Sequence, residues 1–421
     1  MPRAGELRAR LAASVPGPIA AFLAQAVRLA RERHLPLYAA GGAVRDLLLG
    51  LAIPELDLVV EGDAGAYGLA LAEASGAQVV ARSQFGTVKL ALTDHRVDIA
   101  TARSETYRRP GALPTVRPAT TLEDLRRRDF TINAMALRLV PAPARLLDPT
   151  GGQGDMAARL VRVLHAASFQ DDATRILRAI RYEQRLSFRL EPQTLTLLRR
   201  DLSFLDTISP DRLRRELSLV FNEPHAPQAL TRAAELGVLA AIQPVLPDSR
   251  ALGDALALLA GSGFPLRPPH YLGVLAFGLG VSPPAVGRPG PVEGLILRLN
   301  LPPRQAKLVR DTVALRHDAP ALAQETSPAA VYRRLRGYAL EAVQVVAALA
   351  TGEARRHLLR YVDEDRHVRP LLTGDDLARL GVPQGPRVGA LLEALRDARL
   401  DGQLHTREQE EAFVRQHLQR P

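Results

Sequence analysis

The pattern of apolar positions between residues 37 and 60 changes from a continuous run to helical spacing and back. The run Leu37 to Ala40 predicts a buried strand, and the spacing after Gly41 and Gly42 predicts a short helix. A second strand follows at 55–60, where acidic and apolar residues alternate. We therefore predict a strand, a glycine turn, a short helix and a second strand in this stretch.

Strand-like and helical segments continue to alternate up to about residue 139. Residues 67–75 have helical spacing, whereas 78–81, 87–92 and 96–100 have the composition of strands. This alternation predicts an α/β head, a small mixed β-sheet with helices, over residues 36–147. Residues 1–35 have the amphipathic spacing of a helix pair, which we expect to pack on the head.

Helical patterns dominate the rest of the chain. Turn-forming residues at 148–155 close the head, and we expect an all-α remainder made of neck, body and tail domains. The predicted divisions are a helical neck at 148–260, a boundary rich in Pro and Gly at 261–294, and a helical body and tail at 295–421. Within the head, residues 103–121 contain three prolines and a glycine and are expected to form a long loop.

The glycine turn is a candidate phosphate site. Gly41 and Gly42 open a predicted helix, where backbone N–H groups and the helix dipole favour an anion, and Arg45 would add a positive charge. Taken alone, the pattern is more typical of an ordinary Gly-Gly turn followed by an acidic strand end on the solvent face.

Three acidic residues are candidate metal ligands. Glu55 and Asp57 are two positions apart on a predicted strand, so their carboxylates project from the same face. Asp98 lies in the middle of another predicted strand, where it would face them across adjacent strands. The alternative is that all three are ordinary carboxylates on a solvent-exposed face.

The composition of the chain limits the kinds of binding partner, metal site and location that we expect. The formal net charge is +10, which favours a polyanion such as nucleic acid, although a biased genomic base composition would also enrich arginine. The absence of cysteine excludes disulfides and thiolate metal sites, so a metal must bind through oxygen or histidine. No apolar run approaches eighteen residues, so we expect a cytoplasmic protein that does not enter a membrane.

Several motifs in order resemble one known family. GGAVRD followed by ELD, RRDFTINAMA at 127–136, DPTGG at 148–152 and DDATRILRAIRY at 171–182 are similar to motifs of the class II tRNA nucleotidyltransferase/poly(A) polymerase family. Arg212 and Glu216 fall where that family has a further helical motif. One departure concerns the metal motif, which is usually Asp-x-Asp in the family and here begins with Glu55.

The resemblance implies transfer of nucleotides to an RNA 3′-hydroxyl with release of pyrophosphate. It implies two Mg²⁺ ions held by Asp57, Asp98 and Glu55, with Gly41, Gly42 and Arg45 at the triphosphate. The residues expected by resemblance to contact the rest of the nucleotide are Arg127, Arg128, Asp129, Asn133, Asp172, Arg175, Arg178 and Arg212. Asp129 would accept a hydrogen bond from the ribose 2′-OH, which would favour ribonucleotides.

Base choice is expected to depend on Asp172 and Arg175, three residues apart on a predicted helix that Ser168 could cap. Cytosine and adenine each present an amino donor beside a ring-nitrogen acceptor, which match a carboxylate and a guanidinium. We therefore expect addition of C and A from CTP and ATP to the 3′ end of tRNA. The family resemblance links the loop at 103–121 to the switch to A, and because this loop is retained we expect addition of a complete CCA. Alternatives are addition of CC only or A only, polyadenylation, and a non-catalytic RNA-binding protein.

Overall fold

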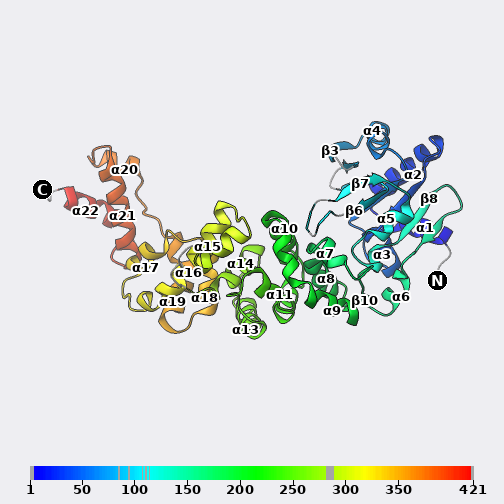
Figure 1. Ribbon diagram of the computed structural model, residues 1–421. Helices are drawn as coiled ribbons and strands as arrows, with labels where there is room; N and C mark the ends of the chain where they lie inside the picture. Colours follow the sequence, from blue (N-terminus) through cyan, green and yellow to red (C-terminus); the bar gives the residue numbers. More distant parts are fainter. Residues whose placement is uncertain are drawn as a thin grey trace. The chain divides into compact units, whose positions relative to one another are not determined.

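The computed structural model describes residues 4–418 except 84–85, 93–94, 107, 110, 113 and 281–288. The chain forms two compact units, Met1–Glu216 and Leu217–Pro421, with the division falling inside one helix. The first unit contains every strand of the described residues, and the second contains helices only (Figure 1). This organisation confirms the predicted mixed head and mostly helical remainder. The finer divisions at 147, 260 and 294 stay predictions, and part of the last boundary lies outside the described residues.

The first unit is built around a seven-stranded sheet with the order β3-β4-β5-β2-β1-β8-β9. Its strands are β1 (Leu37–Ala40), β2 (Glu55–Val60), β3 (Gln78–Ser83), β4 (Thr87–Leu92), β5 (His95–Thr101), β8 (Ala136–Val140) and β9 (Arg145–Leu147). Neighbouring strands are antiparallel except for the central pair β2 and β5, which is parallel.

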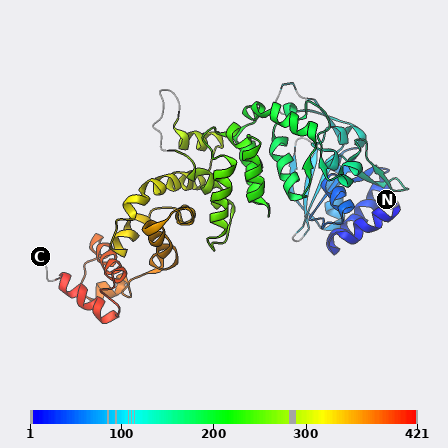
Figure 2. The ribbon, with the colours of Figure 1, turned by 90° about the horizontal axis from the view of Figure 1, so that it is seen from below.

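Helices cover the sheet on the face that carries its apolar side chains. In the central strands Leu56, Leu58, Val97 and Ile99 alternate with the acidic positions and are fully buried. Helix α4 (Ala64–Ser75) packs on β4 and β5, and α1 (Ala4–Ser14) and α2 (Gly17–Glu32) pack on β8. The two N-terminal helices appear in blue beside the strands in Figure 2, which agrees with the predicted helix pair.

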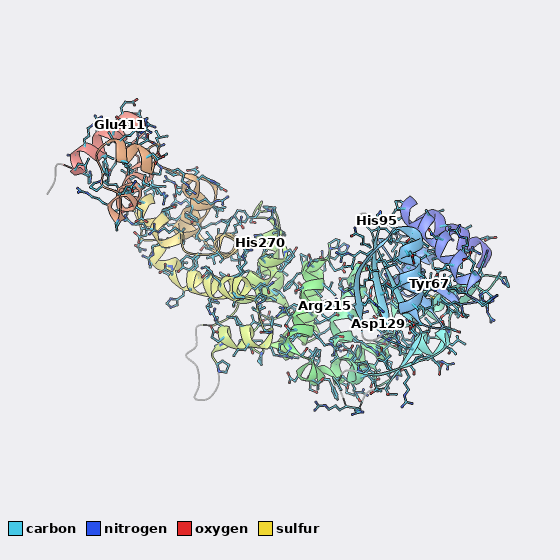
Figure 3. The ribbon with its side chains drawn as sticks, turned by 90° about the horizontal axis from the view of Figure 1, so that it is seen from above. Tyr67, His95, Asp129, Arg215, His270 and Glu411 are labelled. Carbon is cyan, nitrogen blue, oxygen red and sulfur yellow. The ribbon has the colours of Figure 1, made fainter. Side chains whose placement is uncertain are left out.

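Tyr67 fixes α4 against α2, because its buried hydroxyl donates to the carbonyl of Ala26 at 2.6 Å. Burial raises the pKa of Tyr67, so the phenol stays protonated as a donor. The side chain is labelled in Figure 3. Because these helices occupy one face of the sheet, the acidic positions of β2 and β5 lie on the other.

The remaining elements of the first unit carry the other motifs. They are α3 (Gly42–Leu49), β6 (Arg103–Thr106), β7 (Thr115–Pro118), α5 (Thr121–Arg126), η1 (Thr131–Asn133), α6 (Gly152–Ala157), β10 (Leu160–Val161), α7 (Ser168–Asp171), α8 (Thr174–Arg185), β11 (Arg189–Leu190), α9 (Pro192–Arg200), η2 (Leu202–Thr207) and α10 (Pro210–Phe221), the last shared with the second unit.

The expectation of a long loop at 103–121 is wrong for the residues that the structure describes. Strands β6 and β7 pair in antiparallel register from Arg103 opposite Pro118 to Thr106 opposite Thr115. Proline is compatible with this hairpin because Pro118 is the last residue of β7 in a two-stranded sheet. At this position no hydrogen bond between the strands is lost.

The second unit is a succession of helices. They are α11 (Ala226–Glu235), α12 (Val238–Ile242), α13 (Ser249–Ala260), α14 (Pro268–Phe277), α15 (Pro291–Arg298), α16 (Pro303–Leu322), α17 (Pro328–Leu335), α18 (Leu340–Leu349), α19 (Gly352–Asp363), η3 (Asp365–His367), α20 (Gly374–Arg379), α21 (Pro386–Leu400) and α22 (Arg407–Leu418).

The last three helices have a core of their own. Leu377, Leu391, Leu395 and Val414 are among its buried residues. Glu410 of α22 is fully buried and accepts hydrogen bonds from the amides at 371 and 372 and from Arg399. Residues 371–418 therefore form a small structural module, which we call the tail module.

Candidate active site

Asp57 and Asp98 lie side by side on the face of the sheet opposite α4. They are direct partners in the parallel register of β2 and β5, as the sequence predicted. Both are partly buried, whereas Glu55 is exposed and lies opposite Arg96. The structure thus brings two of the three predicted carboxylates together, and the described residues contain no group of three metal-ligating side chains.

The electrostatics of this pair favour a bound cation. Burial raises the pKa of Asp57, the neighbouring carboxylates of Asp98 and Glu55 raise it further, and Arg128 and Lys89 oppose them. A divalent ion such as Mg²⁺ binds hard oxygen ligands and would neutralise the two adjacent charges. Asp57 and Asp98 therefore fit a hard divalent cation.

Gly41 has the backbone conformation that the predicted turn requires. Its φ of +68° lies in the region that glycine tolerates best, and a Cβ there would collide with the guanidinium of Arg128. Its N–H donates to the carbonyl of Met135 at 3.0 Å, so this amide is already engaged at the end of the sheet. Gly42 is the first residue of α3. The turn thus lets a guanidinium approach the backbone closely.

Arg45 is buried rather than directed at solvent. Its guanidinium donates to the carboxylate of Asp46 at 2.9 and 3.0 Å and to Oδ1 of Asn133 at 2.6 Å. It also lies 5.0 Å from the ring centroid of Tyr182, a cation–π distance. Arg45 therefore ties α3 to two other motifs, and direct contact with a triphosphate stays a prediction.

Asp129 continues this network. One of its oxygens accepts from Asn133 at 3.0 Å, and the other accepts from Nε and Nη2 of Arg178, at 3.0 and 2.5 Å. Burial alone would raise the pKa of Asp129, but Arg178 and Asn133 outweigh it and lower the pKa to about 2. A continuous chain of hydrogen bonds, which we call the Asp129 network, thus joins Asp46, Arg45, Asn133, Asp129 and Arg178. Figure 3 labels Asp129.

Arg127 and Arg128 share one buried carboxylate. Asp124 accepts from Arg127 at 2.6 and 3.0 Å and from Arg128 at 3.1 Å, and its side chain is 1% exposed. Arg127 also donates to Glu105 on β6 at 2.8 Å and to the carbonyl of Arg103. The β6–β7 hairpin is therefore fastened to α5 through Arg127.

The prediction that Asp172 and Arg175 share a helix face is wrong. The expected helix is divided into α7 and α8, Ala167 rather than Ser168 precedes α7, and Asp172 has extended backbone between the two helices. The Asp172 carboxylate accepts from the amide and hydroxyl of Thr174, at 3.1 and 2.7 Å. Local capping of this kind competes with helix continuation, which the spacing alone did not indicate.

The two residues also have different partners. Asp172 forms an ion pair with Arg212, whose Nη2 lies 2.8 Å from each carboxylate oxygen. Arg175 is buried and donates to the backbone carbonyls of Ser168 and Arg127, at 3.3 and 2.9 Å. The guanidinium beside Asp172 is therefore that of Arg212.

Sequence reasoning missed several residues that position these groups. Asp124, in the last turn of α5, precedes Arg127 and Arg128 by three and four residues, a spacing that could have identified it. Tyr182 and Glu105 were missed as links between motifs because the partner that makes the link, Arg45 for Tyr182 and Arg127 for Glu105, comes from a distant part of the sequence.

Comparison with known proteins identifies the family. Residues 37–162 match the poly A polymerase head domain, and residues 187–249 match the probable RNA and SrmB-binding site of polymerase A. The A-adding tRNA nucleotidyltransferase of Halalkalibacterium halodurans is 30% identical over 92% of this chain and 90% of its own length. The CC-adding tRNA nucleotidyltransferase of Deinococcus radiodurans is 34% identical over 90% and 88%.

The chain belongs to the tRNA nucleotidyltransferase/poly(A) polymerase family. The predicted membership is thus confirmed, and relatives in this family are nucleotidyltransferases that generally use divalent metal ions. The A-adding enzyme of Geobacter sulfurreducens is also similar, at 35% identity over 94% of this chain, but the chain spans about half of that relative, 47% of its length.

Solved structures of family members have the same fold. The Thermotoga maritima CCA-adding enzyme complexed with tRNA matches with a TM-score of 0.76 and 28% identity over 98% of both chains. A complex of a CCA-adding enzyme with ATP matches with a TM-score of 0.77 and 28% identity over 97% of this chain and 98% of that one. A complex with CTP has a TM-score of 0.75, with 28% identity over 98% of both. None of the described helices is long and apolar enough to cross a membrane.

Proposed function

We propose that this family member transfers nucleotides from CTP and ATP to the 3′ end of tRNA. The observation that carries the proposal is the register pairing of Asp57 with Asp98. Both lie on the face of the sheet opposite the one on which α1, α2 and α4 pack. An RNA-binding protein without activity would have no need to hold two carboxylates against their mutual repulsion. The similarity to complexes with tRNA, ATP and CTP supports the choice of substrates.

In the proposed reaction, the RNA 3′-hydroxyl attacks the α-phosphate and pyrophosphate leaves. Two Mg²⁺ ions, when bound, would lower the pKa of the attacking hydroxyl and neutralise charge on the leaving oxygens. Asp57 and Asp98 would hold the cations, and Glu55, at the exposed start of β2, would be a further ligand. Arg128 lies beside Gly41 and its charge acts on Asp57, so it supplies a fixed positive charge next to these carboxylates.

In this proposal the Asp129 network supports the residues that contact the nucleotide. Its members come from α3, η1 and α8, so it fixes the glycine turn relative to the helix that follows Asp172. Contact of Arg127, Arg128 and Asp129 with the ribose is part of the proposal. Because Arg178 and Asn133 occupy both Asp129 oxygens, a 2′-OH would have to share an oxygen that already accepts a hydrogen bond.

Base selection is proposed to use the carboxylate of Asp172 with a guanidinium. A carboxylate accepts from the exocyclic amino group of cytosine or adenine, and a guanidinium donates to the adjacent ring nitrogen. Uracil and guanine present the reverse order, which would leave charged groups unpaired at a cost of about 1–3 kcal/mol each. Arg212 holds Asp172 in the described structure, so the incoming base must replace one of its hydrogen bonds.

Two extents of addition have support. Complete CCA addition is our first candidate, because the hairpin that the family resemblance links to the switch to A is present and the similar complexes are of CCA-adding enzymes. Addition of A alone is the second candidate, favoured by the similarity to A-adding relatives. Both candidates require A to be added to tRNA ending in CC.

The experiment supplies tRNA ending before CCA, or after CC, with each labelled nucleotide separately. Complete CCA addition gives incorporation of C on the first substrate and of A on the second, with neither UTP nor GTP used. Incorporation of A on the second substrate without any C on the first would assign the A-adding activity. Incorporation of C on the first with no A on the second would overturn both candidates, and long A tracts on any RNA would indicate polyadenylation. A cytoplasmic location stays a prediction.

A further inference from the structure

Lys89 lies in the same row as the two paired carboxylates. In the register of the sheet, Lys89 of β4 is the direct partner of Asp98 on β5, and Asp98 is the direct partner of Asp57 on β2. Lys89 Nζ is 2.5 Å from Oδ2 of Asp98, and its charge also acts on Asp57. Three adjacent strands thus present lysine, aspartate and aspartate on one face.

The ammonium is held loosely compared with the other positive charge at this site. Arg128 is 19% exposed and fixed by the buried carboxylate of Asp124, whereas the Lys89 side chain is 53% exposed. An exposed lysine–carboxylate pair contributes at most about 1 kcal/mol, and a lysine side chain has a flexible stem that can move its charge. Lys89 is therefore able to leave Asp98 at little cost.

We propose that Lys89 is a positioning residue that competes with the divalent ion for Asp98 and thereby weakens divalent-ion binding at this site. The inference rests on the proposed function, which assigns Asp57 and Asp98 as metal ligands. While the ammonium occupies Oδ2, Asp98 is oriented and its charge is compensated. For Asp98 to ligate the ion through Oδ2, Lys89 has to withdraw, and its charge then remains near the ligands and repels the ion.

The geometry also bears on the nucleotide. An ammonium released from Asp98 remains on β4, next to the carboxylates, with a largely exposed side chain. A positive charge there attracts the phosphates of an incoming nucleoside triphosphate. When a nucleoside triphosphate binds, the Lys89 ammonium therefore leaves the carboxylate of Asp98 and pairs with a phosphate of the substrate.

The test measures binding of Mn²⁺ alone, by electron paramagnetic resonance, to the full chain without nucleotide or RNA. Lys89→Met removes the charge and keeps a similar length, and Lys89→Arg keeps the charge. Lys307→Met is the matched control, because Lys307 is also 53% exposed and also pairs with an aspartate, Asp311, at 2.6 Å. Circular dichroism and thermal unfolding verify that each variant is folded.

The expected result is a Kd for Mn²⁺ about threefold to tenfold lower in Lys89→Met than in wild type, consistent with loss of a nearby exposed charge. Lys89→Arg should stay within about twofold of wild type, and Lys307→Met should be unchanged. A folded Lys89→Met protein with unchanged or weaker Mn²⁺ binding would overturn the inference. Equal Mn²⁺ binding by wild type and Asp57→Asn would instead contradict the metal site itself, which separates the two failures.

Discussion

At the scale of single residues, Asp129 is a buried carboxylate that its neighbours keep ionised. Its carboxylate is buried and would be costly to ionise, yet Arg178 and Asn133 stabilise the charged form and lower its pKa to about 2. The ionised carboxylate therefore stabilises the folded chain above the unfolded pKa of about 3.9, and the contribution disappears as the pH falls towards 2. Linkage gives this contribution a size of about 2–3 kcal/mol.

Because the pKa of Asp129 is lowered on folding, its contribution to stability should depend on pH. The free energy of unfolding of wild type should exceed that of Asp129→Asn at pH 5, because the amide deprives Arg178 of its nearest counter-ion and leaves only the more distant Glu216. The difference should shrink between about pH 4 and pH 2 as Asp129 becomes protonated in wild type. Urea unfolding of both proteins at several pH values measures it, and a difference that is independent of pH would show that Asp129 is not held ionised.

Asp172 is the residue at which base choice should be most sensitive. Asp172→Ala removes the acceptor for a base amino group and frees Arg212, so discrimination of CTP and ATP against UTP and GTP should fall by at least about tenfold. The helix α8 also loses the carboxylate that caps Thr174, at about 1 kcal/mol of stability. Asp172→Asn is the control for the cap, since its amide oxygen can still accept from Thr174. Unchanged selectivity in Asp172→Ala would exclude this residue from base choice.

Site residues that could be predicted from the sequence follow a local pattern, whereas those that could not be predicted have partners far away in the sequence. Asp57 and Asp98 could be predicted because strand alternation places them on a face and each strand has a clear apolar pattern. The pairing of Asp172 with Arg212 spans 40 residues of sequence, and no local pattern encodes it. The burial of Arg45 was equally hidden, because its partner Asn133 comes from a distant turn.

At the scale of elements, the β6–β7 hairpin depends on one buried carboxylate. Glu105 has a side chain only 6% exposed and forms ion pairs with Arg103 at 3.0 Å and with Arg127 at 2.8 Å. Removing its charge leaves two guanidinium groups short of a partner and loosens the hairpin on α5. The hairpin is also the segment that the family resemblance links to the addition of A.

We therefore predict that Glu105→Gln impairs the addition of A much more than it impairs the binding of ATP. Incorporation of A into tRNA ending in CC should fall by about tenfold or more, while Kd for ATP alone changes by less than about threefold. Glu123→Gln is a matched control, since Glu123 is an exposed acidic residue of the neighbouring α5 that caps its own helix. Equal effects of the two substitutions on A incorporation would contradict a specific role of the hairpin.

The same hairpin illustrates a limit of local patterns. Prolines at 114 and 118 correctly excluded a helix, but the strands are short and lie outside the main sheet, so no apolar alternation marked them. In contrast, β2, β4 and β5 have one buried face and one open face, and their alternation was visible. Elements that bury a face against the core are the ones that sequence predicts well.

At the scale of the whole molecule, the tail module is attached to α17, where Arg333 and Arg336 pair with Asp397 and Glu393 of α21, but it also has a core of its own. Its helices α20, α21 and α22 share a core, and the buried Glu410 closes it from within. The sequence predicted a helical body and tail that bind tRNA, and the net charge of +10 suits the phosphate backbone. The boundaries between the helical parts remained uncertain in sequence because all of them have the same helical period.

Truncation after residue 369 should weaken tRNA binding and leave ATP binding unchanged. We expect Kd for tRNA to rise by about tenfold or more, with a smaller dependence of log Kd on log salt because phosphate contacts are lost. Fluorescence anisotropy with labelled tRNA at several salt concentrations measures both quantities, and ATP binding verifies that the first unit is intact. A truncated chain with the affinity and salt dependence of the full chain would assign the tail module a packing role only.

The most direct test of the account is incorporation of labelled AMP into tRNA ending in CC, measured with Mg²⁺ for wild type, Asp57→Ala, Asp98→Ala and Glu55→Asp. The account predicts incorporation by wild type, loss of more than about a hundredfold in each alanine variant, and retention of activity in Glu55→Asp. Glu55 is exposed and outside the direct pair, so its shortening is tolerated. Incorporation by a folded Asp57→Ala protein at the wild-type rate would contradict the assignment of this carboxylate pair as the catalytic centre.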